Sequence, residues 1–274
     1  MATILQDPAL AAYEALAPFY DSYTESYDYE RWLPNIERIA RGLGLSGRRL
    51  LDVACGTGRS FLPLLERGYD VTACDISPAM VERAGCAAGG RADVFVADMR
   101  ELPEIGEFDL ITCLDDALNY LLSDEDLLDA LCAMERNLRP GGVLVFDLNS
   151  LSTYRDFFSS DAALETEGMF FCWRGEGDPS AAAGSIASSV VEIFARCDGD
   201  NWRRTSSRHV QRHHPPDLVS ALIGAAGLEL VELRGQVSGA QIDPSGDEES
   251  HVKLVYFARR PHASGSHIEG VRVR

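Results

Sequence analysis

The residues most suited to binding chemistry surround two closely spaced glycines. Gly56 and Gly58 follow a short apolar run at residues 50–54, and Asp75 ends a second apolar run that begins at residue 71. Glycines at such a turn let the backbone approach a ligand closely, and an acid at the end of the next strand accepts hydrogen bonds from ribose hydroxyls. The pattern therefore predicts a nucleoside site at the carboxyl edge of a parallel sheet.

The glycine turn lacks the features of two common phosphate sites. A dinucleotide site carries a third glycine where this chain has Phe61. A P-loop carries Gly-Lys-Ser/Thr, whereas Arg59 and Ser60 follow Gly58 here. A nucleoside without phosphates remains, and S-adenosylmethionine is the common one.

The turn resembles motif I of the class I S-adenosylmethionine-dependent methyltransferases. That motif usually reads acid-x-Gly-x-Gly-x-Gly, so Asp52 matches its acid and Ala54 replaces its first glycine. Residues 94–99, 108–113 and 138–147 look like the family's third, fourth and fifth strands, in the same order. The resemblance implies a methyltransferase that uses S-adenosyl-L-methionine.

The resemblance also implies a set of cofactor contacts. We expect the cofactor to be bound by Tyr20, Trp32, Asp52, Ala54, Cys55, Gly56, Gly58, Asp75, Ile76, Asp98, Met99 and Leu114. In this family the N-terminal helices cover the cofactor, so Tyr20, Tyr29 or Trp32 would shield the sulfonium and bind the carboxylate end of the cofactor, with helix packing as the alternative role. Asp75 as a helix cap and Asp98 as a solvated strand end also stay open.

Two further polar segments supply candidate catalytic residues. Asn119 and Tyr120 follow the expected fourth strand, a position that the family places beside the methyl group. His209 and His213 are four residues apart, so they face one side of a helix or strand. Histidine titrates near neutral pH and can act as a general base, while a packed structural histidine is the alternative. The adjacent pair His213 and His214 resembles a metal-binding pair, but no metal is expected, because no carboxylate or cysteine lies at ligand spacing.

Both segments are similar to a group of bacterial small-molecule methyltransferases. That group reads Asp-x-Leu-Asn-Tyr after its fourth strand, which residues 116–120 match. It reads Glu-x-His-x-Gln-Arg later, and residues 207–212 match except that Ser207 replaces the acid. Related enzymes methylate sugar amino groups or small-molecule hydroxyls, so the resemblance leaves the acceptor atom open.

The composition of the chain limits the kinds of partner that it can bind. The formal net charge of −18 disfavours nucleic acid, because each phosphate contact needs a basic partner. After the expected fourth strand the chain reads Leu-Asp-Asp-Ala at 114–117, where the amino-type nucleic-acid methyltransferases have Asn/Asp-Pro-Pro-Tyr/Phe, and the Pro-Cys dipeptide of the cytosine carbon-5 type is absent. Seven scattered cysteines without a Cys-x-x-Cys pair, no leader-like start and no long apolar run favour a cytoplasmic protein without a membrane partner. A small-molecule methyl acceptor is the expected partner, and a homodimer is an open alternative.

The expected fold is α/β. We predict a Rossmann-like, seven-stranded, mostly parallel sheet with an antiparallel last strand, an N-terminal helical cap and an inserted antiparallel β hairpin as a lid. The expected segments are a helical cap at 1–46, a cofactor-binding core at 47–150, a lid at 151–214, the end of the core at 215–260 and a flexible tail at 261–274.

The predicted activity is in-line methyl transfer from S-adenosylmethionine to a nitrogen or oxygen of a small molecule. The sulfonium carbon is already activated, so positioning supplies most of the catalysis. Two alternatives stay open: a protein that binds the cofactor as a sensor or scaffold without catalysis, and another use of the same cofactor such as decarboxylation-linked alkyl transfer.

Overall fold

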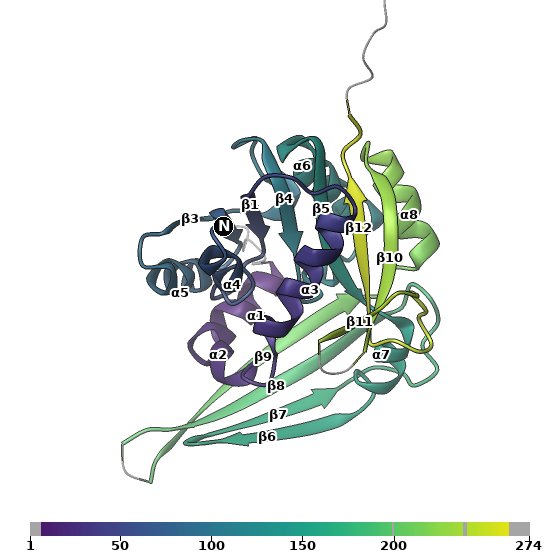
Figure 1. Ribbon diagram of the computed structural model, residues 1–274. Helices are drawn as coiled ribbons and strands as arrows, with labels where there is room; N and C mark the ends of the chain where they lie inside the picture. Colours follow the sequence, from purple (N-terminus) through teal and green to yellow (C-terminus); the bar gives the residue numbers. More distant parts are fainter. Residues whose placement is uncertain (1–6, 199, 238–239, 263–274) are drawn as a thin grey trace, which may run out of the picture.

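A large sheet forms the centre of the molecule (Figure 1). The computed structural model describes residues 7–198, 200–237 and 240–262, so the expected flexible tail lies almost wholly outside the described residues. The sheet has the order β11-β10-β12-β5-β4-β1-β2-β3. Its strands are β1 (Arg49–Val53), β2 (Asp70–Asp75), β3 (Ala92–Val96), β4 (Phe108–Cys113), β5 (Leu138–Asn149), β10 (Glu229–Val237), β11 (Gln241–Asp243) and β12 (Lys253–Arg259).

The pairing directions confirm the predicted fold class. Strands β1 to β5 pair in parallel, whereas β12 lies antiparallel between β5 and β10. The sheet has eight strands rather than the predicted seven, because the chain folds back after β10 and the short β11 pairs with it. β11 has three residues, which are too few to show the alternation of apolar and polar residues that predicts a strand. It is recognised from its antiparallel pairing with β10.

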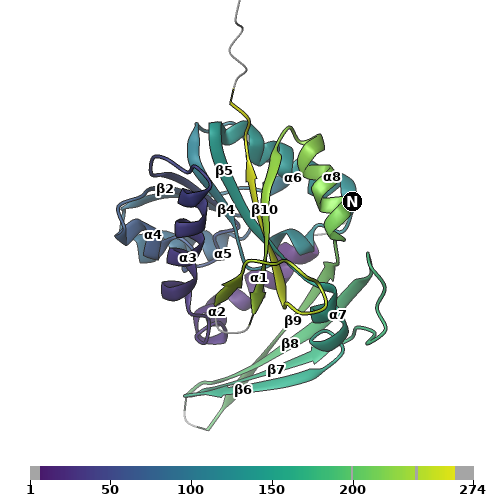
Figure 2. The same cartoon turned by 45° about the vertical axis from the view of Figure 1, so that its right-hand side comes forward.

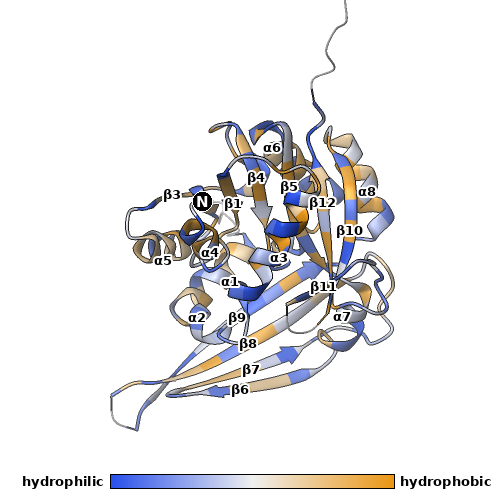
Figure 3. Cartoon of the chain, in the orientation of Figure 1, coloured by the Kyte–Doolittle hydropathy of each residue, from blue (hydrophilic) through white to orange (hydrophobic). Residues whose placement is uncertain are grey.

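Helices cover both faces of this sheet. On one face are α3 (Tyr29–Gly42), α4 (Leu62–Glu66) and α5 (Pro78–Ala88), and on the other are α6 (Asp124–Asn137) and α8 (Pro216–Ala225). Alternate strand residues face opposite sides, so Leu51 joins the core under α6 and α8 while Leu50 joins the core under α3 to α5. Figure 3 shows central strands such as β4 in mostly apolar colours, as burial on both faces requires.

The predicted lid hairpin is part of a larger sheet. A separate antiparallel sheet has the order β6-β7-β8-β9, and its last two strands pair antiparallel, as a hairpin requires. Its strands are β6 (Asp161–Thr166), β7 (Met169–Gly175), β8 (Ile186–Arg196) and β9 (Trp202–Arg212), and α7 (Leu151–Asp156) precedes them. The predicted hairpin is formed by β8 and β9, and β7 and β6 extend it to four strands. The sequence pattern did not indicate β6, because this strand is largely exposed and shows no alternation of apolar and polar residues.

The N-terminal cap lies between the two sheets. It consists of α1 (Pro8–Leu16), a short 3-10 turn (Ala17–Phe19), α2 (Tyr20–Tyr23) and α3. Figures 1 and 2 both place α1 and α2 beside the lid sheet, where Leu16 packs with Phe171 and Ile193. The cap therefore connects the lid to the edge of the main sheet where the predicted site lies. Among the described residues, every helix is too short or too polar to cross a membrane.

Candidate active site

The glycine turn after β1 has the backbone geometry that close approach of a ligand requires. Gly56 and Gly58 have φ angles of +54° and +94°, in the left-handed region that favours glycine. Ala54, at the position where the family usually has glycine, also lies there, with φ +57°. The backbone N–H of Gly56 donates a 2.9 Å hydrogen bond to the carboxylate of Asp75, which joins the turn to the end of β2.

A cavity, here called the first cavity, opens at this turn. Nine of the residues expected to bind the cofactor line it: Tyr20, Ala54, Cys55, Gly56, Asp75, Ile76, Asp98, Met99 and Leu114. Asp75 also accepts a 2.9 Å hydrogen bond from the backbone N–H of Ser77. Burial raises the pKa of Asp75, and the amides of Ser77 and Gly56 offset part of that rise. The structure thus brings the expected acid, turn and aromatic cover together.

Three expected cofactor residues do not line the first cavity. Asp52 is fully buried behind the turn, where its carboxylate accepts hydrogen bonds of 2.5 Å from the hydroxyls of Ser60 and Thr112. Burial raises the pKa of Asp52 to about 7. Gly58 allows close packing, because an added Cβ would stand 2.9 Å from the ring of Phe61. Asp52 and Gly58 therefore support the turn through hydrogen bonds and close packing. Trp32 lines a different cavity.

Two arginines in the first cavity were missed in the sequence. Arg59 donates hydrogen bonds to the backbone carbonyls of Thr24 (2.6 Å) and Tyr27 (3.2 Å), and its guanidinium lies 5.0 Å from the ring centre of Tyr29. The position of Arg59 directly after Gly58 could have indicated from the sequence that it lies at the cavity. Arg100 bonds Asp98 at 3.0 Å and reaches residue 7 of the cap at 2.8 Å. Burial acts to raise the pKa of Asp98, but these bonds to Arg100 hold it below its ordinary value.

The N-terminal cap is fastened over the first cavity by polar contacts. Glu14 of α1 accepts hydrogen bonds from the Ser77 hydroxyl (2.6 Å) and the backbone N–H of Ala79 (3.0 Å) at the start of α5. The hydroxyl of Thr57 donates a 2.6 Å hydrogen bond to Asp21 of α2. A helix start favours negative charge, so Glu14 is well placed there. These hydrogen bonds hold α1 and α2 against the turn and the start of α5.

A second cavity, of about 640 Å³, adjoins the first. Both cavities are lined by Tyr13, Tyr20, Tyr29, Asp115 and Tyr120. The rest of the second cavity is rich in aromatic side chains from the cap, from the segment directly after α7 and from the lid, namely Tyr23, Tyr27, Trp32, Phe157, Phe158 and Trp173. Its volume suits a small organic molecule.

The loop after β4 places two carboxylates in the second cavity. Asp115 and Asp116 have φ angles of +60° and +53°, which is unusual for two consecutive residues other than glycine. The buried Asp147 accepts hydrogen bonds from both of their backbone amides, at 2.7 and 3.0 Å. Lys253 of β12 contacts all three carboxylates within 3.2 Å. Burial acts to lower the pKa of Lys253, but the three aspartates raise it well above its ordinary value.

Two of the predicted catalytic residues meet at the boundary between the cavities. The hydroxyl of Tyr120 lies 2.8 Å from Nδ1 of His209, and Nε2 of His209 lies 3.0 Å from the hydroxyl of Ser207. Burial lowers the pKa of His209 to about 4 and raises that of Tyr120. Both side chains are therefore neutral at pH 7, and Ser207 occupies the place where the similar group has an acid.

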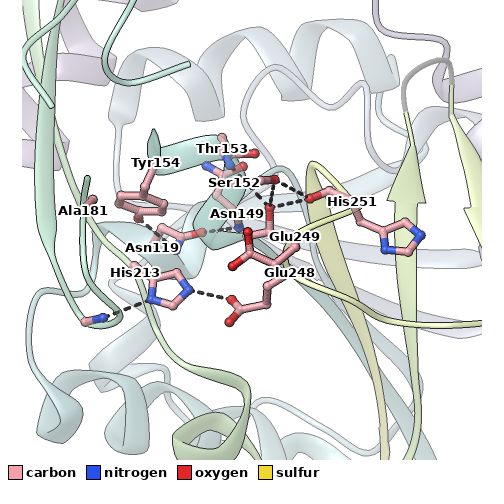
Figure 4. A network of polar contacts seen from close by, with 12 residues as sticks. Asn119, Asn149, Ser152, Thr153, Tyr154, Ala181, His213, Glu248, Glu249 and His251 are labelled. Atoms are coloured by element: carbon pink, nitrogen blue, oxygen red, sulfur yellow. Dashed lines mark hydrogen bonds and ion pairs between the residues drawn. The ribbon is translucent and has the colours of Figure 1, made fainter. Parts of the chain in front are cut away.

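The other two predicted catalytic residues lie in a polar network that joins the lid to the core (Figure 4). Asn119 is completely buried and donates hydrogen bonds to Tyr154 (3.2 Å) and to the carbonyl of Arg212 (2.9 Å). His213 lies 2.6 Å from Glu248 and accepts a 3.0 Å hydrogen bond from the backbone of residue 184. Neither residue is among those that line the two cavities in the described part of the chain. The structure does not bring them to Tyr120 and His209 as one catalytic group.

Comparisons with known proteins agree with this arrangement. A family described as a methyltransferase domain matches residues 50–142. YqeM of Bacillus subtilis (strain 168), a candidate methyltransferase by its name, is 30% identical over 224 residues, which cover 80% of this chain and 87% of YqeM. The similarity to YqeM therefore extends well beyond the glycine turn.

Two solved structures extend this similarity to the whole fold. An S-adenosylmethionine-dependent methyltransferase from Clostridium acetobutylicum ATCC 824 has a TM-score of 0.76 at 24% identity, covering 91% of this chain and 99% of that chain. The sugar N-methyltransferase KedS8 from Streptoalloteichus sp ATCC 53650 has a TM-score of 0.71 at 26% identity, covering 89% of this chain and 93% of that chain. Together with the glycine turn and its acid, these findings place the chain in the class I S-adenosylmethionine-dependent methyltransferases, as an enzyme of the small-molecule type.

Proposed function

We propose that this methyltransferase transfers the methyl group to the nitrogen of a small-molecule amine that binds in the second cavity. The observation that carries the proposal is the group of three carboxylates, Asp115, Asp116 and Asp147, which share the single ammonium of Lys253. The aromatic walls beside them favour a cation or its conjugate amine. Negative charge and aromatic faces together select an amine over a neutral alcohol or an acid.

The residues of the first cavity fit S-adenosylmethionine. The carboxylate of Asp75 would accept hydrogen bonds from the ribose hydroxyls, and Asp98 would face the adenine. The guanidinium of Arg59 would balance the carboxylate at the methionine end, and Tyr20 would cover the reacting end of the molecule. When bound, S-adenosylmethionine supplies a methyl group already activated by a positively charged sulfur.

The enzyme itself then contributes to catalysis by positioning the two reactants and by excluding water. Tyr13, Tyr20, Tyr29, Asp115 and Tyr120 line both cavities, so an acceptor in the second cavity meets the first at this boundary. Holding two reactants in line removes much of the entropic barrier of a bimolecular step.

The proton chemistry supports nitrogen over oxygen. A hydroxyl acceptor needs a base with a pKa near the working pH. His209 is the histidine that lines the described second cavity, and its pKa of about 4 makes it a weak base at pH 7. An amine can lose its proton to water before it binds, so it needs no such base. In this proposal His209 is a positioning residue that holds the hydroxyl of Tyr120 towards the acceptor.

The similar structures support the same acceptor atom. One solved relative is described as a sugar N-methyltransferase, and another is described as an amino pentose methyltransferase. Both similarities cover 89% of this chain, so they extend well beyond the segment that forms the first cavity.

Matched acceptors test the proposal directly. The purified enzyme with S-adenosylmethionine is given primary amines and the alcohols of the same carbon skeleton, and S-adenosylhomocysteine and the methylated product are quantified by mass spectrometry. We expect product from amines only, with a rate that rises with pH as more of the amine is unprotonated. Methylation of the alcohols in preference to the amines would overturn the proposal.

A variant pair ties the result to the carboxylates. Asp116→Asn should lower kcat/KM for amines by about ten- to one-hundredfold, because a charge-assisted contact is worth about 1.5–3 kcal/mol. Asp129→Asn, on the exposed face of α6, serves as the matched control and should retain full activity. Equal kcat/KM in Asp116→Asn and the control would argue against an amine-binding role for Asp115 and Asp116.

A further inference from the structure

One wall of the second cavity carries a stacked pair of aromatic rings. The ring centres of Phe157, which directly follows α7, and Trp173, on β7, lie 4.4 Å apart, and the ring planes are inclined by 28°. Both residues line the cavity, and Phe157 is 42% exposed. Figures 1 and 2 both place α7 beside the lid strands. We infer that this aromatic pair binds a flat, uncharged ring at one end of the acceptor; this inference rests on the proposed function.

The aromatic pair is held in place by its own contacts. The indole N–H of Trp173 donates a 3.3 Å hydrogen bond to the backbone carbonyl of Phe157. The buried ring of Phe158 packs edge-on against Trp173, with ring centres 5.4 Å apart. Aromatic rings prefer to meet a further ring edge to face or stacked with an offset. An exposed aromatic face that is fixed in this way offers a preorganised surface to a flat ring.

The strand register of the lid gives the distance from the aromatic pair to the reacting end of the acceptor. Trp173 stands opposite Val191 of β8, and Val191 stands opposite Ser207 of β9, so the three side chains share one face of the sheet. Neighbouring strands are about 4.8 Å apart, so Trp173 and Ser207 are separated by roughly 10 Å. The hydroxyl of Ser207 lies 3.0 Å from His209, which contacts Tyr120 at the boundary between the cavities.

The main sheet gives a similar distance by a different path. Asn149, at the end of β5, donates a 3.0 Å hydrogen bond to Gln211, and Gln211 donates one of 2.6 Å to the carboxylate of Asp116. The chain continues from Asn149 through Ser150 into α7, whose six residues span about 9 Å before Phe157. The aromatic pair therefore lies well away from the carboxylates, and the acceptor needs a linker between its nitrogen and its ring.

The charges around the second cavity disfavour an anionic group on the acceptor. Among the described residues that line it, Lys253 is the one lysine or arginine, and three carboxylates already surround its ammonium. A phosphate or carboxylate on the acceptor would be left without a cation, which is costly in a buried site.

A second ammonium is disfavoured at the aromatic pair. The described acidic residues that line the second cavity come from the cap and from the loop after β4, whereas those from α7 and the lid carry no negative charge. The predicted acceptor class is thus an amine joined by a linker of roughly 10 Å to an uncharged aromatic or similarly flat ring.

The test compares 6-phenylhexylamine with n-hexylamine, which lacks the ring, on the full-length enzyme. The extended chain of 6-phenylhexylamine places its ring centre roughly 10 Å from the nitrogen. We expect kcat/KM to be at least about tenfold higher for 6-phenylhexylamine, because burial of a ring of this size is worth that factor. 6-Aminohexyl phosphate and 1,6-diaminohexane carry a charge in place of the ring, and neither should show this gain.

Variants of the aromatic pair tie the gain to these two rings. Phe157→Leu and Trp173→Leu should each reduce the ratio of kcat/KM between 6-phenylhexylamine and n-hexylamine to within about threefold. The ratio cancels any general loss of activity in the variants. Phe170→Leu and Trp202→Leu replace lid aromatics that are 37% and 46% exposed and are not among the described lining residues of either cavity. They are the matched controls and should keep the ratio of the native enzyme.

Binding separates this inference from the proposed function. 6-Phenylhexan-1-ol has no amine, so calorimetric titration with it in the presence of S-adenosylhomocysteine reports on the ring site without methyl transfer. Binding by the native enzyme that weakens in Phe157→Leu and Trp173→Leu would support the ring site even if no amine were methylated. Methylation of 6-phenylhexylamine and n-hexylamine with equal kcat/KM, or a ratio retained in both variants, would overturn the inference and leave the proposed function intact. A higher kcat/KM for 6-aminohexyl phosphate than for 6-phenylhexylamine would also overturn it.

Discussion

The carboxylate of Asp147, at the end of β5, accepts a hydrogen bond of 2.7 Å from the backbone N–H of Asp115. The same carboxylate accepts from the next amide and contacts Lys253 at 3.0 Å. Burial raises the pKa of Asp147 to about 6, although Lys253 acts to lower it. One buried side chain thus fixes a loop whose two consecutive left-handed residues present the carboxylates of the second cavity.

Asp147→Asn tests this loop support. The amide group of asparagine would turn an N–H towards one of the two backbone donors and leave Lys253 with less negative charge. Losing one partner of a buried ion pair costs about 3–5 kcal/mol of unfolding free energy. Urea denaturation should show that loss, and kcat for an amine acceptor should fall in the remaining folded enzyme.

A buried carboxylate at the opposite end of the sheet provides the control for Asp147. Asp109 accepts from the backbone N–H of Arg49 at 2.8 Å and pairs with Arg139. Asp109→Asn should destabilise the fold without changing KM for the acceptor. If kcat of Asp147→Asn, calculated per folded enzyme molecule, equals that of the native enzyme, the loop keeps its shape without this carboxylate.

Asp75→Ala should weaken S-adenosylmethionine binding and leave the fold largely intact. A charged partner lost from the ribose hydroxyls raises Kd by about ten- to one-hundredfold, since such bonds are worth about 1.5–3 kcal/mol. Calorimetric titration measures the affinity, and Asp70→Ala, at the exposed start of the same strand, is the control. Unchanged affinity in Asp75→Ala would remove the ribose assignment.

Substitutions in the turn after β1 should change the stability of the protein by different amounts. Gly58→Ala should destabilise most, because its φ is +94° and the new Cβ would stand 2.9 Å from Phe61. Gly56→Ala meets only an ordinary contact of 3.5 Å with Tyr20, so it should cost about 1–2 kcal/mol from the left-handed backbone alone. Ala54→Gly removes the same strain and should stabilise slightly. Thermal unfolding checks the order, and a Gly58→Ala variant as stable as Gly56→Ala would contradict the close packing.

His209 should make the protein sensitive to acid. Burial lowers its pKa in the folded state to about 4 from an ordinary value of 6.5, so the unfolded chain binds the proton first as the pH falls. Stability from neutral His209 is therefore complete above pH 6.5 and is lost progressively down to pH 4. Between pH 7.5 and 5 the loss is about 2 kcal/mol, at about 1.4 kcal/mol for each pKa unit.

Comparison with His209→Gln isolates this effect from the other titrating groups. Urea unfolding of both proteins at pH 7.5 and pH 5 gives the difference between their stabilities at each pH. That difference should shift against the native protein by about 2 kcal/mol at the lower pH. A difference that is the same at both values would mean that His209 titrates normally.

The first cavity could be predicted from the sequence because its key residues lie close together in the chain. The glycine turn and Asp75 fall within one strand-turn-helix-strand unit, and the chirality of that unit brings them to the same edge of the sheet. Asp52 and Trp32 were expected to contact the cofactor, but neither lines the first cavity. The side chain of Asp52 is buried against Ser60 and Thr112, and Trp32 lines the second cavity, because the fold decides where each side chain points.

Local periodicity and turn chemistry encode the α/β fold, the parallel strands and the nucleoside turn, so these features could be predicted from the amino-acid sequence. The tertiary structure alone decided the four-stranded lid, the second cavity and the meeting of Lys253 with Asp115, residues that lie 138 positions apart. It also placed Tyr120 and His209 in the lining of the second cavity, and Asn119 and His213 in a polar network beside it. Contacts between distant segments depend on how sheets and helices pack, and no local pattern of residues records that packing.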